Sequence, residues 1–156
     1  MTGVTAQHTL ALGITTSGGV MGTGRDLWNE WETLHNKHDW AGLASFFTPD
    51  AVYVYPFGRR EGPEAISVYF AGMGKAFPDI NLDTSQVIDD GDIVMAEWMS
   101  RITHTRPFTM PNGRQIAATG KMLEIAGVIV ARVRDGKFAT MRDYYDTADL
   151  MRQISG

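Results

Sequence analysis

The chain has 156 residues, no cysteine and a formal net charge of −4, from 18 acidic and 14 basic side chains. This length corresponds to one domain with room for a small-molecule cavity, and the absence of cysteine excludes disulfides and thiolate metal sites. The negative charge argues against nucleic acid as a partner. Because no 18-residue apolar run and no basic leader are present, we expect neither a membrane span nor secretion, and we expect a cytoplasmic protein.

Residues 1–24 are rich in glycine and threonine and show no periodic pattern. The glycine-rich run over 18–24 is not followed by the Lys-Ser/Thr pair of a phosphate-binding loop, so that function is excluded. We interpret 1–24 as an N-terminal extension that packs across a dimer, and 25–156 as a single domain.

A first amphipathic helix is predicted over 26–40, because Leu27, Trp31, Leu34 and His38 recur at helical spacing and Trp28 widens the stripe. Asp39 can cap a short second helix, which Thr48-Pro49-Asp50 would end. His35 and His38 have a spacing that could hold a metal. No third ligand is in evidence, so we expect a solvated helix end and no metal site.

A strand follows over 51–55, and its alternation places Tyr53 and Tyr55 on one face. A third helix begins at Gly62-Pro63-Glu64 and ends at Pro78. Its buried stripe consists of Ile66, Phe70, Met73 and Phe77.

After Pro78 the pattern changes to strands. Two are predicted over 82–88 and 93–105, joined by a hairpin at Asp89-Asp90-Gly91-Asp92. A further strand over 115–126 follows the turn at 111–113, Gly127 predicts a bulge or bend, and 128–133 leads into the final strand. A C-terminal helix is predicted over 147–154. Segregated helices and strands indicate an α+β fold, with a curved, mostly antiparallel sheet wrapped around the N-terminal helices and an apolar interior.

The final strand follows the turn at Asp135-Gly136-Lys137. Arg142 belongs in water, so the face that carries Met141, Asp143 and Tyr145 is the better candidate for the interior. A carboxylate on an apolar strand face must be paired, protonated or in use, because burying it alone costs several kcal/mol. The residues themselves leave both a structural and a catalytic Asp143 open.

This order of elements resembles the nuclear transport factor 2-like superfamily of cone-shaped α+β barrels across about residues 25–153. The resemblance rests on Phe46-Phe47-Thr48-Pro49-Asp50-Ala51-Val52-Tyr53, Glu61-Gly62-Pro63-Glu64-Ala65-Ile66, Ala76-Phe77-Pro78-Asp79, Asp89-Asp90-Gly91-Asp92, Thr103-His104-Thr105, Pro111-Asn112-Gly113-Arg114, Asp135-Gly136-Lys137 and Arg142-Asp143-Tyr144-Tyr145-Asp146. The superfamily includes ketosteroid isomerase, scytalone dehydratase, limonene-epoxide hydrolase and the SnoaL-like polyketide cyclases. The resemblance implies a deep cavity for a small hydrophobic molecule and a homodimer through the open sheet face. It implies no metal or organic cofactor.

The catalytic residues of ketosteroid isomerase are not present at the matching positions of this sequence. Tyr55 stands where that enzyme has its base aspartate, and Trp31 stands where it has its oxyanion tyrosine. The partner aspartate falls near Ile129 or Val130. The isomerase reaction is therefore not expected.

Limonene-epoxide hydrolase and the SnoaL-like cyclases match better, because both resemblances place a functional aspartate at Asp143. Trp98 and Ser100 stand where the hydrolase has its arginine and second aspartate. Its water-holding tyrosine matches Tyr53, and Tyr55 stands where it has an asparagine. Ile129 stands where the cyclases have their pocket histidine.

The first hypothesis is an enzyme that acts on an apolar, oxygen-bearing molecule with Asp143 as general acid or base, in epoxide hydrolase-like or polyketide cyclase-like chemistry. His104 has the strand parity of Trp98 and Ser100, so it could face inward and share a proton with Asp143, although a bulge would turn it outward. The expected substrate-binding residues are Tyr53, Tyr55, Trp98, Ser100, Phe70, Met141, Tyr145 and Trp31.

The second hypothesis is a non-catalytic hydrophobic-ligand binding or protein-association module on the same fold. The incomplete catalytic sets favour it, since one fold hosts many functions.

Overall fold

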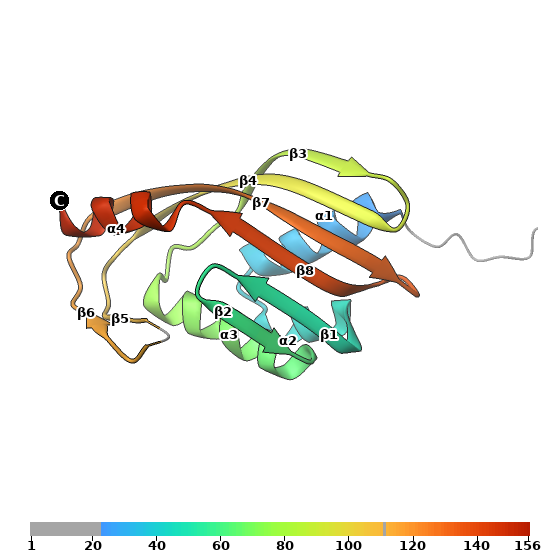
Figure 1. The fold of residues 1–156 in the computed structure, drawn as a ribbon, viewed down its shortest axis with the longest axis horizontal. Helices are drawn as coiled ribbons and strands as arrows, with labels where there is room; N and C mark the ends of the chain where they lie inside the picture. Colours follow the sequence, from blue (N-terminus) through green and yellow to red (C-terminus); the bar gives the residue numbers. More distant parts are fainter. Residues whose placement is uncertain (1–22, 111) are drawn as a thin grey trace, which may run out of the picture.

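The structure of the protein, a computed structural model, describes residues 23–110 and 112–156. The predicted packing of the N-terminal extension across a dimer therefore concerns residues outside the described part, apart from Thr23 and Gly24. Thr23 forms a capping box with Asp26 and so begins helix α1 (Gly24–Asn36), seen in blue in Figure 1.

Helix α1 ends four residues before its predicted end, because Lys37 is its C-cap and His38 adopts a positive φ of 59°. Asp39 caps α2 (Trp40–Leu43) as predicted, and a 3-10 turn over Ala44–Phe46 follows. The prediction that His35 lies at a solvated helix end is wrong. This residue is 2% exposed, because it lies on the same buried face of α1 as Trp28 and Trp31.

Strand β1 (Phe47–Tyr55) begins earlier than predicted, so Thr48-Pro49-Asp50 belong to the strand and do not end a helix. It forms a hairpin with β2 (Gly58–Glu61), a strand that the sequence analysis did not predict. Helix α3 (Pro63–Ala76) agrees with its prediction. Gly62 caps it with a φ of 81°, which favours glycine, and its side chains Ile66 and Phe70 are buried.

The remaining long strands are β3 (Asp83–Asp89), β4 (Ile93–Thr103), β7 (Met122–Arg134) and β8 (Lys137–Tyr145). With β1 and β2 they form a six-stranded sheet in the order β2-β1-β8-β7-β4-β3. Only β1 and β8 pair in parallel; the other neighbours in this sheet are antiparallel. The fold is the curved α+β architecture that the sequence predicts.

The bulge predicted at Gly127 is not present, since β7 runs unbroken and Gly127 pairs in register with Trp98 and with Tyr145. An added Cβ would lie 2.5 Å from the carbonyl oxygen of Tyr144 and 2.7 Å from Cζ2 of Trp98. Glycine is needed here because the Trp98 ring lies directly on the β7 backbone. Part of the long strand predicted over 115–126 instead forms a small hairpin of β5 (Phe108–Thr109) and β6 (Gln115–Ile116).

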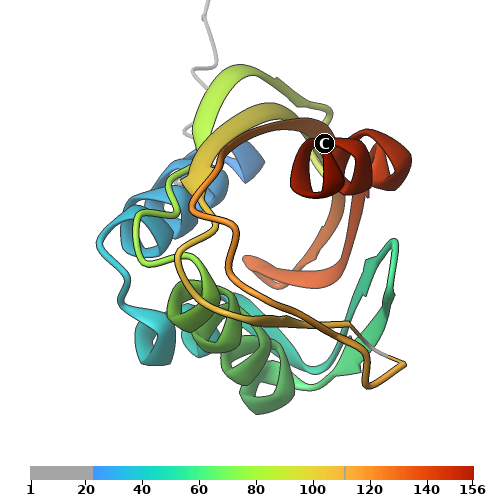
Figure 2. The same cartoon turned by 90° about the vertical axis from the view of Figure 1, so that its left-hand side faces the viewer.

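The sheet curves around a central space, with α1 and α3 on its concave side (Figure 2). Helix α4 (Thr147–Ser155) lies near one end, where Leu150 and Ile154 pack with Phe77, Ile102 and Leu123. No helix in the described ranges is long and apolar enough to cross a membrane.

The convex face of the sheet carries an apolar row. The strand register places Val54, Val130, Met95 and Ile88 in line across the sheet, with Arg142 between Val54 and Val130. Ile88 is 51% exposed and Met95 39%. The homodimer through this face remains a prediction.

Candidate active site

A cavity of about 770 Å³ lies on the concave side of the sheet. Its walls come from α1, β1, α3, β4, β7, β8 and α4, and most of its lining side chains are aromatic or aliphatic. This volume is that of a typical pocket for a drug-sized ligand, and the walls favour an apolar body with few polar groups.

Asp143 provides the single carboxylate among the described lining residues. Each of its oxygens accepts a hydrogen bond from a buried side chain. The Tyr53 hydroxyl donates to Oδ2 over 3.1 Å, and Nε1–H of Trp98 donates to Oδ1 over 3.1 Å. The predicted inward face of β8 is confirmed, since Met141 is buried and Asp143 and Tyr145 line the cavity while Arg142 is exposed.

Burial raises the pKa of the Asp143 carboxyl from its ordinary value of 3.8 to about 7. The hydrogen bonds from Tyr53, Trp98 and the backbone N–H of Tyr144 act in the opposite direction, because they stabilise the charged form. The carboxyl is therefore able both to accept and to release a proton near neutral pH.

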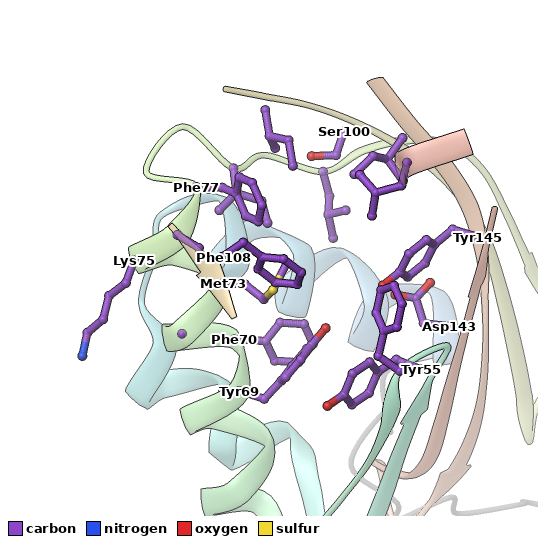
Figure 3. Close-up of a pocket in the computed structure, with 18 of the residues that line it drawn as sticks. Tyr55, Tyr69, Phe70, Met73, Lys75, Phe77, Ser100, Phe108, Asp143 and Tyr145 are labelled. Atoms are coloured by element: carbon purple, nitrogen blue, oxygen red, sulfur yellow. The ribbon is translucent and has the colours of Figure 1, made fainter. Parts of the chain in front are cut away.

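Four tyrosines surround this carboxyl. Tyr53 stacks on Tyr55 with ring centroids 5.4 Å apart, and Tyr55 lies 4.4 Å from Tyr69. Figure 3 shows Tyr145 and Tyr55 beside Asp143, with Tyr69 on the facing helix α3. Burial is the main cause that raises the pKa values of Tyr53, Tyr69 and Tyr145. The Asp143 carboxylate is the next cause for Tyr53 and Tyr145, and for Tyr69 it follows the effect of Tyr145, so all three hydroxyls stay protonated and can donate hydrogen bonds.

Most of the residues expected at the substrate site do lie on the cavity wall: Tyr53, Tyr55, Trp98, Ser100, Phe70, Tyr145 and Trp31. Met141 differs, because its side chain is fully buried in the core and does not line the cavity. Ser100 lines the cavity, but its hydroxyl already donates to the carbonyl oxygen of Asn81 over 2.6 Å.

The structure does not bring His104 to Asp143. Strand β4 ends at Thr103, so the alternation that would have pointed His104 into the cavity stops one residue earlier. The imidazole is fully buried away from the cavity lining, where Nδ1 lies 3.1 Å from Oγ1 of Thr119 and the ring packs on Phe77. Its backbone bonds to Lys121, Thr119 and Gly120, which indicates a structural role.

The cavity lining also includes residues that the sequence analysis did not assign to the site, among them Tyr69 and His35. Tyr69 precedes Phe70 on α3, and only the width of the buried helix face would have indicated it. His35 lies four residues after Trp31, a helical spacing that was visible but was assigned to the solvated side. Among the described residues, no three His, Cys, Asp or Glu side chains cluster as metal ligands would.

A family model described as SnoaL-like polyketide cyclase matches residues 25–154. No curated protein matches the chain. The chain is structurally similar to AclR from Streptomyces galilaeus, with a TM-score of 0.71 and 23% identity over 83% of this chain and 93% of that one.

A SnoaL-like polyketide cyclase from Agrobacterium tumefaciens has a TM-score of 0.69 and 14% identity, over 86% of this chain and 99% of that one. TerC, co-crystallised with polyporic acid, has a TM-score of 0.66 and 19% identity over 85% and 98% of the two chains. At these identities the structural likeness shows the fold, which is the cone-shaped α+β barrel expected from the sequence.

Proposed function

Because the chain belongs to the SnoaL-like polyketide cyclase family, we propose that it is an enzyme that moves protons on a flat, apolar, oxygen-bearing molecule held in the cavity. Asp143 is the general acid and base of this reaction. The observation that carries the proposal is a lone carboxyl on an apolar cavity wall, held by Tyr53 and Trp98, with a pKa raised to about 7.

The reaction that fits this site is ring closure through an enolate. The Asp143 carboxylate takes a proton from a carbon next to a carbonyl group. The electron pair of that C–H bond forms a C=C bond to the carbonyl carbon, and the π pair of the carbonyl moves onto its oxygen. The enolate carbon then attacks a second carbonyl of the same molecule and forms the new C–C bond. The proton on Asp143 passes to the resulting alkoxide, so the atoms and charges balance and the product is an isomer of the substrate.

The tyrosines around Asp143 supply the stabilisation that this path requires. A developing enolate oxygen needs hydrogen-bond donors that are already in place, since preorganised donors are often the largest contribution to catalysis. Tyr145 and Tyr69 line the cavity close enough to Asp143 that its charge raises the pKa of both hydroxyls. We assign these two hydroxyls as the donors to the oxyanion.

Epoxide hydrolysis is less well supported by the same residues. In the resemblance to limonene-epoxide hydrolase, Trp98 and Ser100 stand where an arginine and a second aspartate would act. Trp98 donates to Asp143 itself, and Ser100 donates to a backbone carbonyl. The described lining therefore offers no second carboxylate to activate a water molecule.

Proton abstraction can be tested without the natural substrate, by using 2-tetralone, a bicyclic ketone with exchangeable protons next to its carbonyl. The protein should speed deuterium exchange of these protons in D2O, followed by proton NMR. The rate should rise with pH through about 7, because the carboxylate is the active form. Asp143→Asn should lose at least about 100-fold, the usual minimum for a general base, while Asp90→Asn in the exposed β3–β4 hairpin should not change the rate.

A binding titration with 2-tetralone separates this proposal from the binding-module hypothesis. Binding of 2-tetralone by the wild type and by Asp143→Asn, with no exchange above the buffer rate in either protein, would contradict catalysis and favour a ligand-binding module.

A further inference from the structure

The cavity lining carries an excess of positive charge, although the chain as a whole is acidic. Among its described residues, Arg60, Lys75 and Arg106 are cationic, whereas Asp143 is the single acid. Lys75 points away from the cavity in Figure 3, and Arg106 is exposed in the loop before β5. Arg60, on β2, is half-buried, and the proposed reaction does not use it.

Strand pairing places Arg60 on the cavity side of β2. It lies opposite Tyr53 in the β1–β2 ladder, and residues directly opposite each other share a face of the sheet. Tyr53 lines the cavity and donates to Asp143. Side-chain alternation puts Arg59 and Glu61 on the other face of β2, where both are exposed and form an ion pair with each other. Arg60 is therefore the charged residue of β2 that faces the cavity.

Two tyrosine rings hold the Arg60 guanidinium in place. Its Cζ lies 5.5 Å from the centroid of the Tyr55 ring and 5.7 Å from that of the Tyr69 ring, which is the range of a cation–π contact. Burial raises the pKa of the Tyr55 hydroxyl, and the charge of Arg60 opposes this rise. Because both rings line the cavity, the positive charge is held at the cavity wall.

The guanidinium has no acidic partner in the described part of the chain, where the ion pairs join other residues. Its one hydrogen bond to a described residue runs from Nη1 to the carbonyl oxygen of Arg59 over 2.7 Å. A guanidinium has several more N–H donors, arranged in a planar fork. A cation at an apolar cavity wall with donors to spare favours a ligand that brings a negative charge.

We propose that Arg60 binds a carboxylate group of the molecule in the cavity, so that the substrate is a ring system that carries a carboxylic acid. A carboxylate can accept two parallel N–H bonds from one guanidinium, and its single charge is balanced by a single arginine. This carboxylate site rests on the proposed function, since it assigns a second recognised group to the same substrate.

The tyrosine rings also indicate where the carboxylate stands on the substrate. The Tyr69 ring contacts Arg60 and lies 5.3 Å from the Tyr53 ring, whose hydroxyl donates to Asp143. A substrate that meets both charged groups therefore lies along these rings. Its carboxylate is distant from the carbon that loses a proton, because a second negative charge beside Asp143 would oppose ionisation of that residue.

The test compares the affinities of 2-naphthoate and 2-naphthamide, which have nearly the same shape and differ in charge. At pH 6 the wild type should prefer 2-naphthoate. The preference should fall at least about tenfold in Arg60→Gln, as expected for the loss of charge-assisted hydrogen bonds. Arg59→Gln is the matched control, because it removes the same charge from the other face of β2, and it should change the preference by less than about twofold.

A second measurement needs no variant. In the wild type, the Nε–H signal of Arg60, assigned through its side-chain couplings, should shift on addition of 2-naphthoate and not of 2-naphthamide. Equal shifts with the two probes would overturn the carboxylate site, even if Arg60→Gln failed to fold by circular dichroism.

The outcomes separate the two proposals. The carboxylate site is wrong if the wild type does not prefer 2-naphthoate, if both arginine variants lower the preference equally, or if only Asp143→Asn lowers it. Deuterium exchange of 2-tetralone by the wild type would then still support the proposed function. A preference that depends on Arg60, with exchange of 2-tetralone at the buffer rate, would instead keep the carboxylate site and overturn the catalytic proposal.

Discussion

Asp143→Asn should change how the stability of the protein depends on pH. The folded protein holds the Asp143 proton more tightly than the unfolded chain does, because burial raises the pKa of this carboxyl from 3.8 to about 7. The contribution to stability is therefore fully present below about pH 4 and is lost as the pH rises through about 7. Asparagine does not titrate, so the variant lacks this dependence.

The size of the effect follows from the two pKa values. At about 1.36 kcal/mol per pH unit, the full loss amounts to about 4 kcal/mol. About 2.5 kcal/mol of it falls between pH 5 and pH 8, a range in which most proteins stay folded. The asparagine amide can accept from Trp98 and donate to the Tyr53 oxygen, so the substitution keeps both contacts of the carboxyl.

The measurement is urea unfolding of the wild type and of Asp143→Asn at pH 5, 6, 7 and 8, followed by circular dichroism. Subtracting the two unfolding free energies at each pH removes the contribution of the other titrating groups. The wild type should lose about 2.5 kcal/mol relative to the variant between the extremes. A difference that stays constant, or one that favours the wild type as the pH rises, would refute a desolvated carboxyl and indicate a solvated or ion-paired one.

Tyr53→Phe removes the hydroxyl that stabilises the Asp143 carboxylate, so carboxyl-carbon NMR should give a pKa above the value of about 7 for the wild type. Gly127→Ala should lower the unfolding free energy by about 2–3 kcal/mol in urea, because its Cβ would collide with the Tyr144 backbone and the Trp98 ring. We also propose that two copies of the chain associate through the apolar row on the convex sheet face. Met95→Lys, at the centre of that row, should weaken the dimer at least tenfold in sedimentation equilibrium, since it buries a charge in an apolar contact.

Matched controls exist for each change. Trp98→Phe removes the other donor to Asp143 and should also raise the carboxyl pKa, so an unchanged value in both variants would contradict the assigned hydrogen bonds. Gly72→Ala, in the middle of α3 with no atom within 4 Å of the added Cβ, should stabilise the protein. Val68→Lys, exposed on α3, should leave the dimer intact, and equal weakening by both lysines would argue against the convex face.

The order of the helices and of the long strands could be predicted from local patterns, because helix and strand periods and turn residues act over a few positions. The same reasoning placed Asp143 correctly: side chains alternate along a strand, and Arg142 had to face water. Helix caps such as Asp39 and Gly62 were also predictable, since a cap satisfies backbone groups that lie within the same few residues.

The predictions that failed concern residues whose surroundings come from distant parts of the chain. His104 had the right parity, but β4 ends one residue before it, and the bonds to Thr119, Gly120 and Lys121 determine its position. Gly127 was read as a bend, whereas the ring of Trp98 on the neighbouring strand is what requires a glycine there.

The sequence by itself determined the α+β class, the hairpins at 89–92 and 135–137 and the inward face of the last strand, since periodicity and turn chemistry are local. Only the tertiary structure decided what meets Asp143. Trp98 and Tyr53 are 45 and 90 residues away along the chain, and the order and curvature of the sheet bring both to one carboxyl. The raised pKa of the Asp143 carboxyl depends on this arrangement, because the desolvation that causes it comes from side chains of several segments together.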